Sequence, residues 1–407
     1  MRNLFLLFFI CFSTSLSAQT TAGMVAYYTM DSSLIDVTGN TANIGVVVGA
    51  TDYKCGVLAS SLLLDGSNTE ISFKGPVNNE FDTEDLSISF YFKSSSNAGT
   101  QYLMSKRDST CQGENEFLLR YVPSSNTINC IFAENTSKNI SLVHPLSNDI
   151  CWNHVAIVRE NTRVTLYVNG EFAAQQGTLS RIDLFNNGYL TLGNAICKSS
   201  TETGFGGLID ELRIYNRSLD AEEVEGLYFS PDKIINRDTN IFLGSAVNIE
   251  LTNTCAEDFN WTPADDLSSP FDAEPIITPK IAGAEVYTIE MTDLETGCTA
   301  RDSVRINVVD PNDLECDVVY LPKAFTPNGD NLNDTYGISN PFAIQELISF
   351  EIYDRWGGRV FATDTAFERW DGSFNGDLIN PGVMIYKVVY VCDNTEKQTT
   401  GSFTILK

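Results

Sequence analysis

The stretch Trp152-Asn-His-Val-Ala-Ile-Val-Arg-Glu-Asn-Thr-Arg-Val-Thr-Leu-Tyr-Val-Asn-Gly170 decides the fold of the largest part of this chain. Residues 155–158 and 164–168 read as strands, and in the second one Val164, Leu166 and Val168 alternate with polar or aromatic residues that face the other way. Asn-Gly after a strand is the strongest short-range signal of a β-hairpin. The stretch therefore predicts antiparallel hairpins.

The same pattern continues on both sides of this stretch. Residues 86–92 and 117–122 read as strands, and about a dozen such strands between residues 24 and 228 predict two packed antiparallel sheets. The last strand, residues 208–215, leads into a short helix with Asp220 at its N-cap position and Glu223 three residues on, a capping-box arrangement.

Four sequence blocks in this part carry a family resemblance. They are Tyr27–Asp31, Leu62–Ser67, Trp152–Val158 and Gly207–Tyr228. Together they resemble the LamG-like, concanavalin A-type jelly roll, which we expect over residues 19–230. This fold hosts lectins, adhesive modules and hydrolases, so the resemblance does not by itself imply an activity.

Residues 231–310 form a smaller module with strands expected at 247–251, 259–261, 286–291 and 303–308. The runs Trp261–Pro270 and Thr296–Asp302 resemble the Ig-like or PKD-like spacer repeats that precede sorting domains. We therefore expect a small β-sandwich that acts as a spacer.

The C-terminal part, residues 311–407, consists of short alternating strands between Pro, Asn, Gly and Asp clusters, typical of another small sandwich. It resembles the gliding-motility-associated C-terminal domain, the type B sorting domain of the type IX secretion system. The motif residues that carry the resemblance are Pro327, Asn328, Gly329, Asp330, Trp356, Gly357, Trp370, Asp371 and Gly372. The resemblance implies the type IX machinery of the outer membrane as a partner and a location outside the cell. The predicted fold class is thus all-β: one jelly roll and two small Ig-like sandwiches.

The ends and the charge of the chain agree with export. Residues 1–18 read as a signal peptide, with Arg2 before an apolar run that is too short to span a bilayer, and no other stretch is apolar enough to be a transmembrane anchor. The net charge of −27 argues against nucleic acid as a partner, because no basic patch is present to neutralise phosphates.

Ten cysteines are present, and nine remain after Cys11 is removed with the signal peptide. No Cys-x-x-Cys pair occurs, and an oxidising compartment favours disulfides. Pairing within each module predicts Cys111–Cys130, Cys255–Cys298 and Cys316–Cys392. Cys55, Cys151 and Cys197 then compete for one further bridge, and because nine is odd, one thiol stays unpaired or the pairing is incomplete.

Catalytic signals are weak. The two histidines are His144 and His154, neither accompanied by a nucleophile elbow, and His154 is expected to have a packing role. The segment Glu80-Phe-Asp-Thr-Glu84 is similar to the motif of laminarinase-like glycoside hydrolases, which would need a strand that directs its carboxylates to one side. Thr83 fits this pattern poorly, so we expect a connecting loop and no enzyme.

Calcium is the one cofactor that the sequence suggests. In concanavalin A-type modules an Asp near the first strand and an acidic residue in the last strand often flank a calcium site, and Asp31 and Asp210 match those places, with Asp65 as a further candidate. The alternative is that these residues stabilise turns and strand ends.

The expected function is recognition or adhesion outside the cell. Aromatic residues suited to stacking on sugars include Tyr27, Tyr28, Tyr91, Tyr121 and Tyr189, but the sequence does not single out a carbohydrate site. We expect a non-catalytic binding protein whose ligand is a glycan or, next, a surface or matrix protein. The alternatives are a polysaccharide hydrolase that uses Glu80 and Glu84, and a purely structural surface protein.

Overall fold

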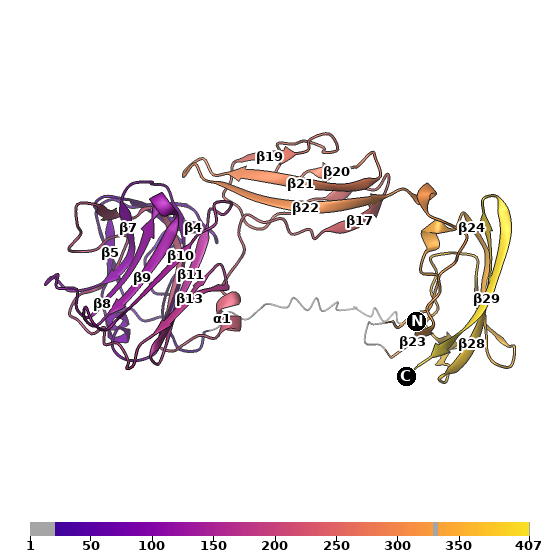
Figure 1. The fold of residues 1–407 in the computed structure, drawn as a ribbon, viewed down its shortest axis with the longest axis horizontal. Coiled ribbons are helices and arrows are strands. Elements are labelled where there is room, and N and C mark those ends of the chain that lie inside the picture. The colour runs from indigo at the N-terminus through magenta and orange to yellow at the C-terminus, as the bar shows by residue number, and fades with distance from the viewer. Residues whose placement is uncertain (1–20, 329–332, 407) are drawn as a thin grey trace, which may run out of the picture. The chain divides into compact units, whose positions relative to one another are not determined.

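The computed structural model describes residues 21–328 and 333–406, and they are almost entirely β-structure (Figure 1). The chain divides into two compact units. The first comprises residues up to Arg237 together with Val247–Ile277 and Val286–Arg305; the second comprises Asp238–Ala246, Thr278–Glu285 and Ile306–Lys407. The predicted signal peptide and the motif residues Gly329 and Asp330 lie outside the described residues. The expected boundaries at 230 and 310 remain predictions.

One sheet of the jelly roll, here the back sheet, has eight strands in the order β13-β12-β11-β6-β16-β4-β3, with β1 paired to β16, and every neighbour is antiparallel. Its strands are β1 (Met24–Tyr28), β3 (Asp52–Cys55), β4 (Ser60–Asp65), β6 (Leu86–Ser94), β11 (Asn153–Glu160), β12 (Arg163–Val168), β13 (Glu171–Gly177) and β16 (Gly206–Tyr215).

The other sheet, here the front sheet, also has eight strands, in the order β10-β9-β8-β7-β14-β5-β2. Only β15 pairs in parallel, with β7. The strands are β2 (Gly45–Val48), β5 (Glu70–Phe73), β7 (Thr100–Lys106), β8 (Glu116–Val122), β9 (Thr127–Ala133), β10 (Asn139–Pro145), β14 (Leu190–Leu192) and β15 (Glu202–Gly204). The prediction of two packed antiparallel sheets is confirmed apart from this short strand.

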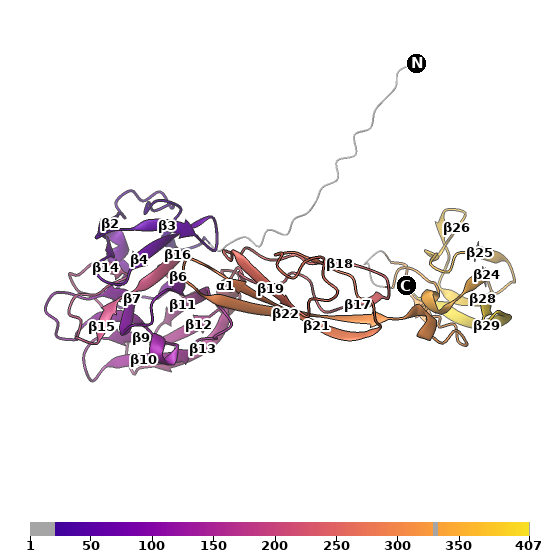
Figure 2. The same cartoon turned by 90° about the horizontal axis from the view of Figure 1, so that it is seen from above.

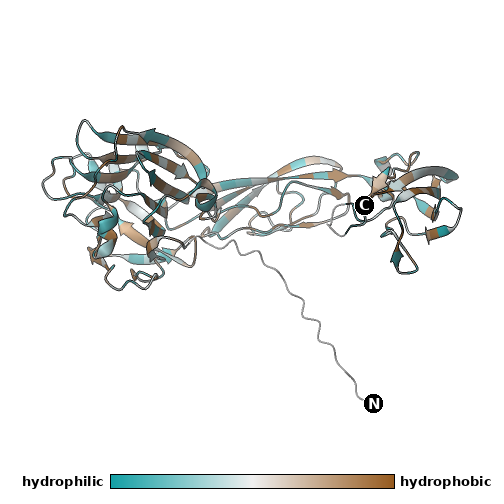
Figure 3. Cartoon of the chain, turned by 90° about the horizontal axis from the view of Figure 1, so that it is seen from below, coloured by the Kyte–Doolittle hydropathy of each residue, from teal (hydrophilic) through white to brown (hydrophobic). Residues whose placement is uncertain are grey.

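The core lies between the two sheets because each strand turns its apolar residues to one side. Along the strands hydrophobic and hydrophilic residues alternate (Figure 3), and fully buried side chains such as Phe90 on β6, Ile157 on β11 and Leu119 on β8 belong to one cluster. Removing this apolar surface from water is the main driving force for the sandwich. Asn169 and Gly170 both have positive φ, 52° and 79°, as a two-residue hairpin turn of type I′ requires.

The back sheet also carries a buried layer on its outer side. Helix α1 (Ala221–Glu225) lies there, and its buried Val224 clusters with Ala156 and Tyr215 of the sheet. The predicted capping box is confirmed: Asp220 Oδ1 accepts from the N–H of Glu223 at 2.8 Å, and Glu223 Oε2 accepts from the N–H of Asp220 at 3.0 Å. Four short 3₁₀ turns complete the helical structure of the described residues: Pro76–Glu80, Pro123–Ser125, Pro311–Asp313 and Pro341–Ala343.

The middle stretch forms a four-stranded sheet in the order β17-β22-β21-β19, whose strands are labelled in Figure 2, and a two-stranded ribbon of β18 and β20. The strands are β17 (Thr239–Phe242), β18 (Val247–Asn248), β19 (Asp258–Thr262), β20 (Ile276–Ile277), β21 (Gly283–Thr292) and β22 (Thr299–Val309). The strand expected over 247–251 is shorter than predicted. Trp261 is buried and donates its indole N–H to the carbonyl of Asp272 at 3.0 Å.

The C-terminal part forms a five-stranded sheet, β23-β29-β28-β24-β25, and the small ribbon β26-β27. The strands are β23 (Ala324–Phe325), β24 (Glu346–Tyr353), β25 (Arg359–Thr363), β26 (Ser373–Phe374), β27 (Asp377–Leu378), β28 (Gly382–Cys392) and β29 (Thr395–Ile405). Buried rings of Phe325, Tyr336, Trp370 and Phe403 form the centre of its core.

The disulfides correct two predicted pairs. Cys316–Cys392 forms as predicted, but Cys111 pairs with Cys197, Cys55 with Cys255, and Cys151 with Cys298. The predicted Cys111–Cys130 bridge is wrong because Cys130 lies on β9 with its side chain buried in the core, where it remains a free thiol. The predicted Cys255–Cys298 bridge is wrong because each of these cysteines forms its disulfide with a cysteine of the jelly roll, Cys55 and Cys151 respectively. The odd thiol expected from the count is therefore Cys130.

Candidate functional site

A row of hydroxyl side chains crosses three neighbouring strands on the outer side of the front sheet. Thr191 on β14 lies opposite Ser72 on β5 and opposite Ser105 on β7. These residues alternate with Leu190, Leu192 and other core residues, so their side chains point away from the core. The three hydroxyl residues line a cavity of about 250 Å³, here called the front cavity.

Two loops provide the walls of the front cavity. Arg107, Asp108 and Ser109 follow β7, and Asn187, Gly188 and Tyr189 precede β14. The ring of Tyr189 is 48% exposed, and the ammonium of Lys74 lies 3.2 Å from its centroid, a cation–π contact. An exposed aromatic ring thus stands beside a polar floor.

Close contacts brace these walls. A Cβ on Gly188 would lie 1.9 Å from the carbonyl oxygen of Arg107, so only glycine permits the two loops to approach this closely. Asn186 donates to the carbonyl of Asn115 at 2.6 Å and accepts from the N–H of Gly188 at 2.8 Å. The Cys111–Cys197 disulfide joins the loop after β7 to the loop after β14. The cavity is therefore preorganised, which lowers the entropic cost of binding.

Charges of both signs border the hydroxyl row. Glu70 accepts from the amide of Asn194 at 3.2 Å, and the guanidinium of Arg107 pairs with Glu116 at 2.7 Å. Hydrogen bonds from Thr110 lower the pKa of Asp108. Burial lowers the pKa of the neighbouring Lys106 to about 8, and its ammonium donates to both the carbonyl and the side-chain oxygen of Asn186. The site therefore offers hydrogen-bond donors and acceptors and charges of both signs.

The structure separates the aromatic candidates. Tyr27 and Tyr28 hydrogen-bond inside the protein, and Tyr91 is buried with its hydroxyl donating to the carbonyl of Leu227 at 2.9 Å. Tyr121 is only 9% exposed. Of the five, Tyr189 alone combines exposure with a place in the front cavity. The sequence contains no signal for Ser72, Ser105 and Thr191, because strands on a solvent face commonly carry such residues.

The two carboxylates of the alternative hydrolase, Glu80 and Glu84, do not lie on a common strand. Glu80 ends a 3₁₀ turn, and Glu84 lies in the irregular segment before β6, so the strand that the mechanism needs is missing. Burial, followed by the nearby Asp82, raises the pKa of Glu80, which lines a cavity with Asn40 and Asn43, whereas Glu84 lies 3.6 Å from Arg181. The segment is a connecting loop, as expected, and this geometry gives no support to the hydrolase alternative.

His154 has the packing role that was expected. It is fully buried on β11, its Nε2 lies 2.8 Å from the hydroxyl of Ser89, and its ring contacts Tyr91. Burial, with a further contribution from Arg213, lowers its pKa to about 3, so the ring is neutral at physiological pH.

The three calcium candidates do not form one cluster. Asp31 accepts from the N–H of Ser60, the first residue of β4, at 2.9 Å, and Asp210 accepts from the N–H of Val57, between β3 and β4, at 2.8 Å. Asp65 instead accepts backbone N–H bonds within its own turn, which lower its pKa despite the opposing effect of burial. Burial and the neighbouring Glu211 raise the pKa of Asp210 to about 9. A site that uses all three carboxylates does not fit this arrangement.

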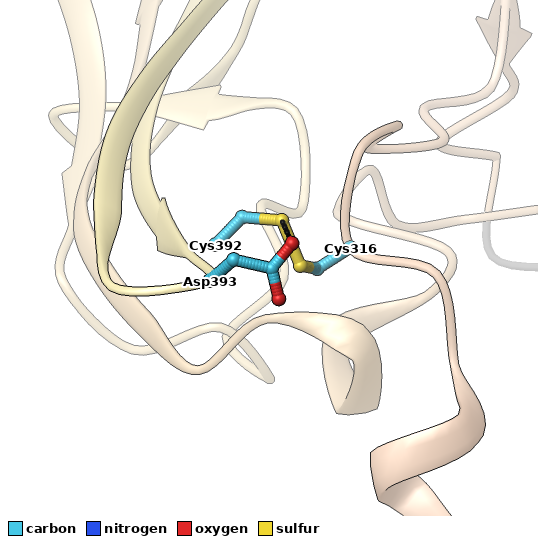
Figure 4. A group of neighbouring side chains, drawn as sticks. All are labelled: Cys316, Cys392 and Asp393. Carbon is cyan, nitrogen blue, oxygen red and sulfur yellow. Dashed lines mark hydrogen bonds between the residues drawn. A yellow bond between two sulfur atoms is a disulfide. The ribbon is translucent and has the colours of Figure 1, made fainter.

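Among the described residues one group has the spacing of a metal site, Cys316, Cys392 and Asp393 (Figure 4). Both sulfurs belong to the disulfide between Cys316 and Cys392. A disulfide offers no thiolate, which is the form of cysteine that binds metals. The group is therefore a cross-link that fixes the end of β28.

The sorting motif divides into buried and exposed members. Trp370 is 3% exposed and donates its indole N–H to the carbonyl of Ser373, while Asp371 accepts from the N–H of Ser373. Gly372 has φ 85°, and a Cβ there would lie 3.0 Å from Pro327. Trp356, in contrast, is 82% exposed at the turn between β24 and β25. Asn328 donates its N–H to the carboxylate of Asp334 at 2.9 Å.

Family models match two parts of the chain. Residues 65–225 match the concanavalin A-like lectin/glucanases superfamily, and residues 319–405 match the CHU_C type IX secretion signal domain. A search of curated proteins finds no match. Of the helices in residues 21–328 and 333–406, none has the length and apolar character that a membrane crossing requires.

Several solved structures resemble this chain at low identity. Domain 4 of AbnA, a GH43 extracellular arabinanase from Geobacillus stearothermophilus in complex with arabinotriose, is 21% identical with a TM-score of 0.40, covering 50% of this chain and 98% of that one. The Ruminococcus gnavus IT-sialidase CBM40 is 17% identical with a TM-score of 0.35, covering 45% and 96%. The binding domain of Paraclostridial Mosquitocidal Protein 1 is 18% identical with a TM-score of 0.43, covering 66% and 64%.

Proposed function

Since the chain carries a concanavalin A-like domain and a type IX secretion signal domain, we propose that it is an exported, non-catalytic protein that binds carbohydrate through its jelly roll. The observation that carries this proposal is the front cavity, where the Ser72–Thr191–Ser105 row lies beside the exposed ring of Tyr189.

The chemistry of the front cavity suits a saccharide. Sugar hydroxyls both donate and accept hydrogen bonds. Ser105 and Thr191 donate their hydroxyls to the carbonyls of Asn194 and Tyr189, which leaves their oxygens as acceptors, whereas Ser72 lines the same cavity. Glu70 adds an acceptor, and the ring of Tyr189, which Lys74 contacts on one face, is 48% exposed and suits the apolar face of a sugar. These groups need no movement of the backbone, because the disulfide and Gly188 hold both loops.

The test is a glycan array with the full chain, followed by titration of any glycan that binds. Tyr189→Ala is expected to weaken binding by tenfold or more, because the stacking surface is lost. Tyr320→Ala, which removes a 60% exposed tyrosine outside the jelly roll, is the matched control and should bind as the wild type does. Glycan binding that survives Tyr189→Ala and Thr191→Trp together would exclude the front cavity as the site.

The chelator arm of the same array tests calcium. The candidate calcium ligands are Asp31 and Asp210, which contact Ser60 and Val57 and lie outside the front cavity. Chelator-sensitive binding that Asp31→Asn also weakens would support calcium at that place. Binding that ignores the chelator would keep the carbohydrate function and remove the metal.

A protein ligand and a purely structural role are the competing outcomes. Absence of binding to every glycan would favour them over carbohydrate recognition. Export is tested separately by deleting residues 314–407, which include the secretion signal match. We expect the truncated protein to accumulate in the periplasm, and normal delivery to the cell surface would contradict the sorting role.

A further inference from the structure

A second cavity lies where the jelly roll meets the middle stretch within the first compact unit. It has a volume of about 310 Å³ and is here called the junction cavity. The jelly roll contributes Asn97 after β6, Tyr121 near the end of β8 and Asn153 at the start of β11. The middle stretch contributes residues 296–298. The cavity therefore exists only when both parts are in place.

Covalent and ionic contacts hold the middle stretch at this cavity. Cys298 is itself a lining residue and bonds to Cys151 of the jelly roll. Next to it, Asp293 accepts from the N–H of Thr296 at 2.8 Å and forms a buried ion pair with Lys93 of β6. The wall formed by residues 296–298 is therefore fixed to the jelly roll.

One buried polar group in this cavity lacks a partner. Asn153 is 6% exposed, and its side-chain oxygen makes no hydrogen bond. A buried acceptor without a protein partner favours a ligand that donates a hydrogen bond to it. Asn126 nearby is held by Tyr121, whose hydroxyl donates to it at 3.0 Å. The polar surface is thus oriented in advance.

The charges around the cavity limit the class of ligand. Among its described lining residues, which are mainly Asn, Ser and Thr with Phe92 and Tyr121, none is Asp, Glu, Lys or Arg. A carboxylate or phosphate bound here would lose its hydration without gaining a cation. A purely apolar ligand would leave Asn153 unsatisfied. A neutral ligand that is rich in hydroxyl groups fits both limits, and the volume is at the small end of ligand pockets, about 300–1,000 Å³.

We propose that the junction cavity is a second saccharide site, which takes one neutral sugar residue and is completed by residues 296–298. This proposal rests on the carbohydrate class proposed for the chain but not on the front cavity. A chain with two separate sites can hold one polysaccharide at two points or bridge two glycans, which raises avidity without a new contact at either site.

The test uses saturation-transfer NMR titrations of the full chain with methyl glycosides of glucose, galactose and mannose, and with the matching uronic acids. At least one neutral glycoside is expected to bind ten times more tightly than its uronic acid partner. Asn97 is exposed at the mouth of the cavity, so Asn97→Trp should fill the opening and weaken binding of that glycoside by tenfold or more. Asn139→Trp, the same change at an exposed position of β10 outside the cavity, should leave it unchanged.

Variants at the two cavities distinguish this inference from the proposed function. Binding that persists in Tyr189→Ala and is lost in Asn97→Trp supports the junction site. Binding that is lost in Tyr189→Ala and unaffected by Asn97→Trp overturns the junction site and keeps the front cavity. Tighter binding of the uronic acids would contradict the neutral class. If the wild type binds no glycan on the array and no probe by NMR, both proposals fail.

Discussion

Cys151 and Cys298 form a disulfide that joins the segment before β11 of the jelly roll to the segment before β22 of the middle stretch. A second disulfide, Cys55–Cys255, also joins these two parts. Cys151 and Cys298 are 147 positions apart in the chain, and Cys55 and Cys255 are 200 positions apart. The stretch predicted to act as a spacer is therefore fastened to the jelly roll at two points.

Removing the Cys151–Cys298 link should destabilise the first unit. A cross-link that closes a long loop typically contributes about 2–4 kcal/mol by restricting the unfolded chain. We expect the double variant Cys151→Ser/Cys298→Ser to lose stability in this range in urea denaturation under non-reducing conditions. The fully reduced wild type should lose more, since all four bridges open. Equal stability of the double variant and the oxidised wild type would contradict this role.

The buried ion pair Lys93–Asp293 leads to a second prediction. Both side chains are almost fully buried, and Lys93 also lies 4.8 Å from the ring centroid of Trp152. Burial raises the pKa of Asp293, but the ammonium of Lys93 and the N–H of Thr296 lower it overall. Lys93→Met should cost about 3–5 kcal/mol because it leaves a buried carboxylate unpaired.

The control for Lys93 uses charge removal at both partners. Lys93→Met/Asp293→Asn should recover most of the loss, since the amide still accepts from Thr296 and the unpaired carboxylate of Asp293 is removed. Arg301→Met, which breaks an exposed pair with Glu290, should change stability by about 1 kcal/mol or less. Urea titrations of the wild type and of each variant give the free energies of unfolding that are compared. A double variant as unstable as Lys93→Met would show that the charge is not the cause.

Local patterns along single strands could be predicted from the sequence, but partners across the chain could not. Asn169-Gly170 and the Asp220–Glu223 cap depend on neighbouring residues, and both form as predicted. The Cys55–Cys255 bridge was missed because pairing within modules assumed that the modules are not cross-linked. Cys130 lies on the same face of β9 as Ile128 and Phe132, and this alternation itself predicts a buried thiol.

The front cavity could not be predicted for a related reason. Ser72 and Ser105 look like ordinary solvent-facing strand residues, and only the strand order β7-β14-β5 brings them to either side of Thr191. This order places β14 between strands that precede it by more than eighty residues, and the sequence carries no local signal for it. Tyr189 was among the aromatic candidates, but its exposure follows from the fold.

His154 predicts an acid-sensitive stability. Its folded pKa of about 3 lies below the value of about 6.5 in an unfolded chain, so below pH 6.5 the unfolded state takes up a proton that the folded state does not. Stability therefore falls as the pH falls from about 6.5 toward about 3. Because of His154, the free energy of unfolding should fall by about 2 kcal/mol between pH 7.5 and pH 5.

The measurement is urea denaturation of the wild type and of His154→Gln across that pH range. The variant keeps a hydrogen-bonding group beside Ser89 but does not titrate, so the stability difference between the two proteins should shift by about 2 kcal/mol in favour of the variant at pH 5. Parallel pH curves would mean that His154 takes up its proton equally in both states.

The two motif tryptophans of the secretion signal domain should respond in opposite ways. Trp370 is packed against Phe325 and Phe403, so Trp370→Ala is expected to lose about 3–5 kcal/mol of stability. Trp356 is 82% exposed and contacts mainly Arg355, so Trp356→Ala should leave the thermal midpoint within a few degrees of the wild type. An exposed tryptophan beside a cavity of about 190 Å³ suits contact with another protein. We therefore expect Trp356→Ala to reduce the amount of protein that is delivered to the cell surface. Surface labelling of intact cells measures delivery, with Phe367→Ala, an exposed aromatic outside that cavity, as the matched control. Normal delivery of a stable Trp356→Ala protein would assign the recognition to another part of the domain.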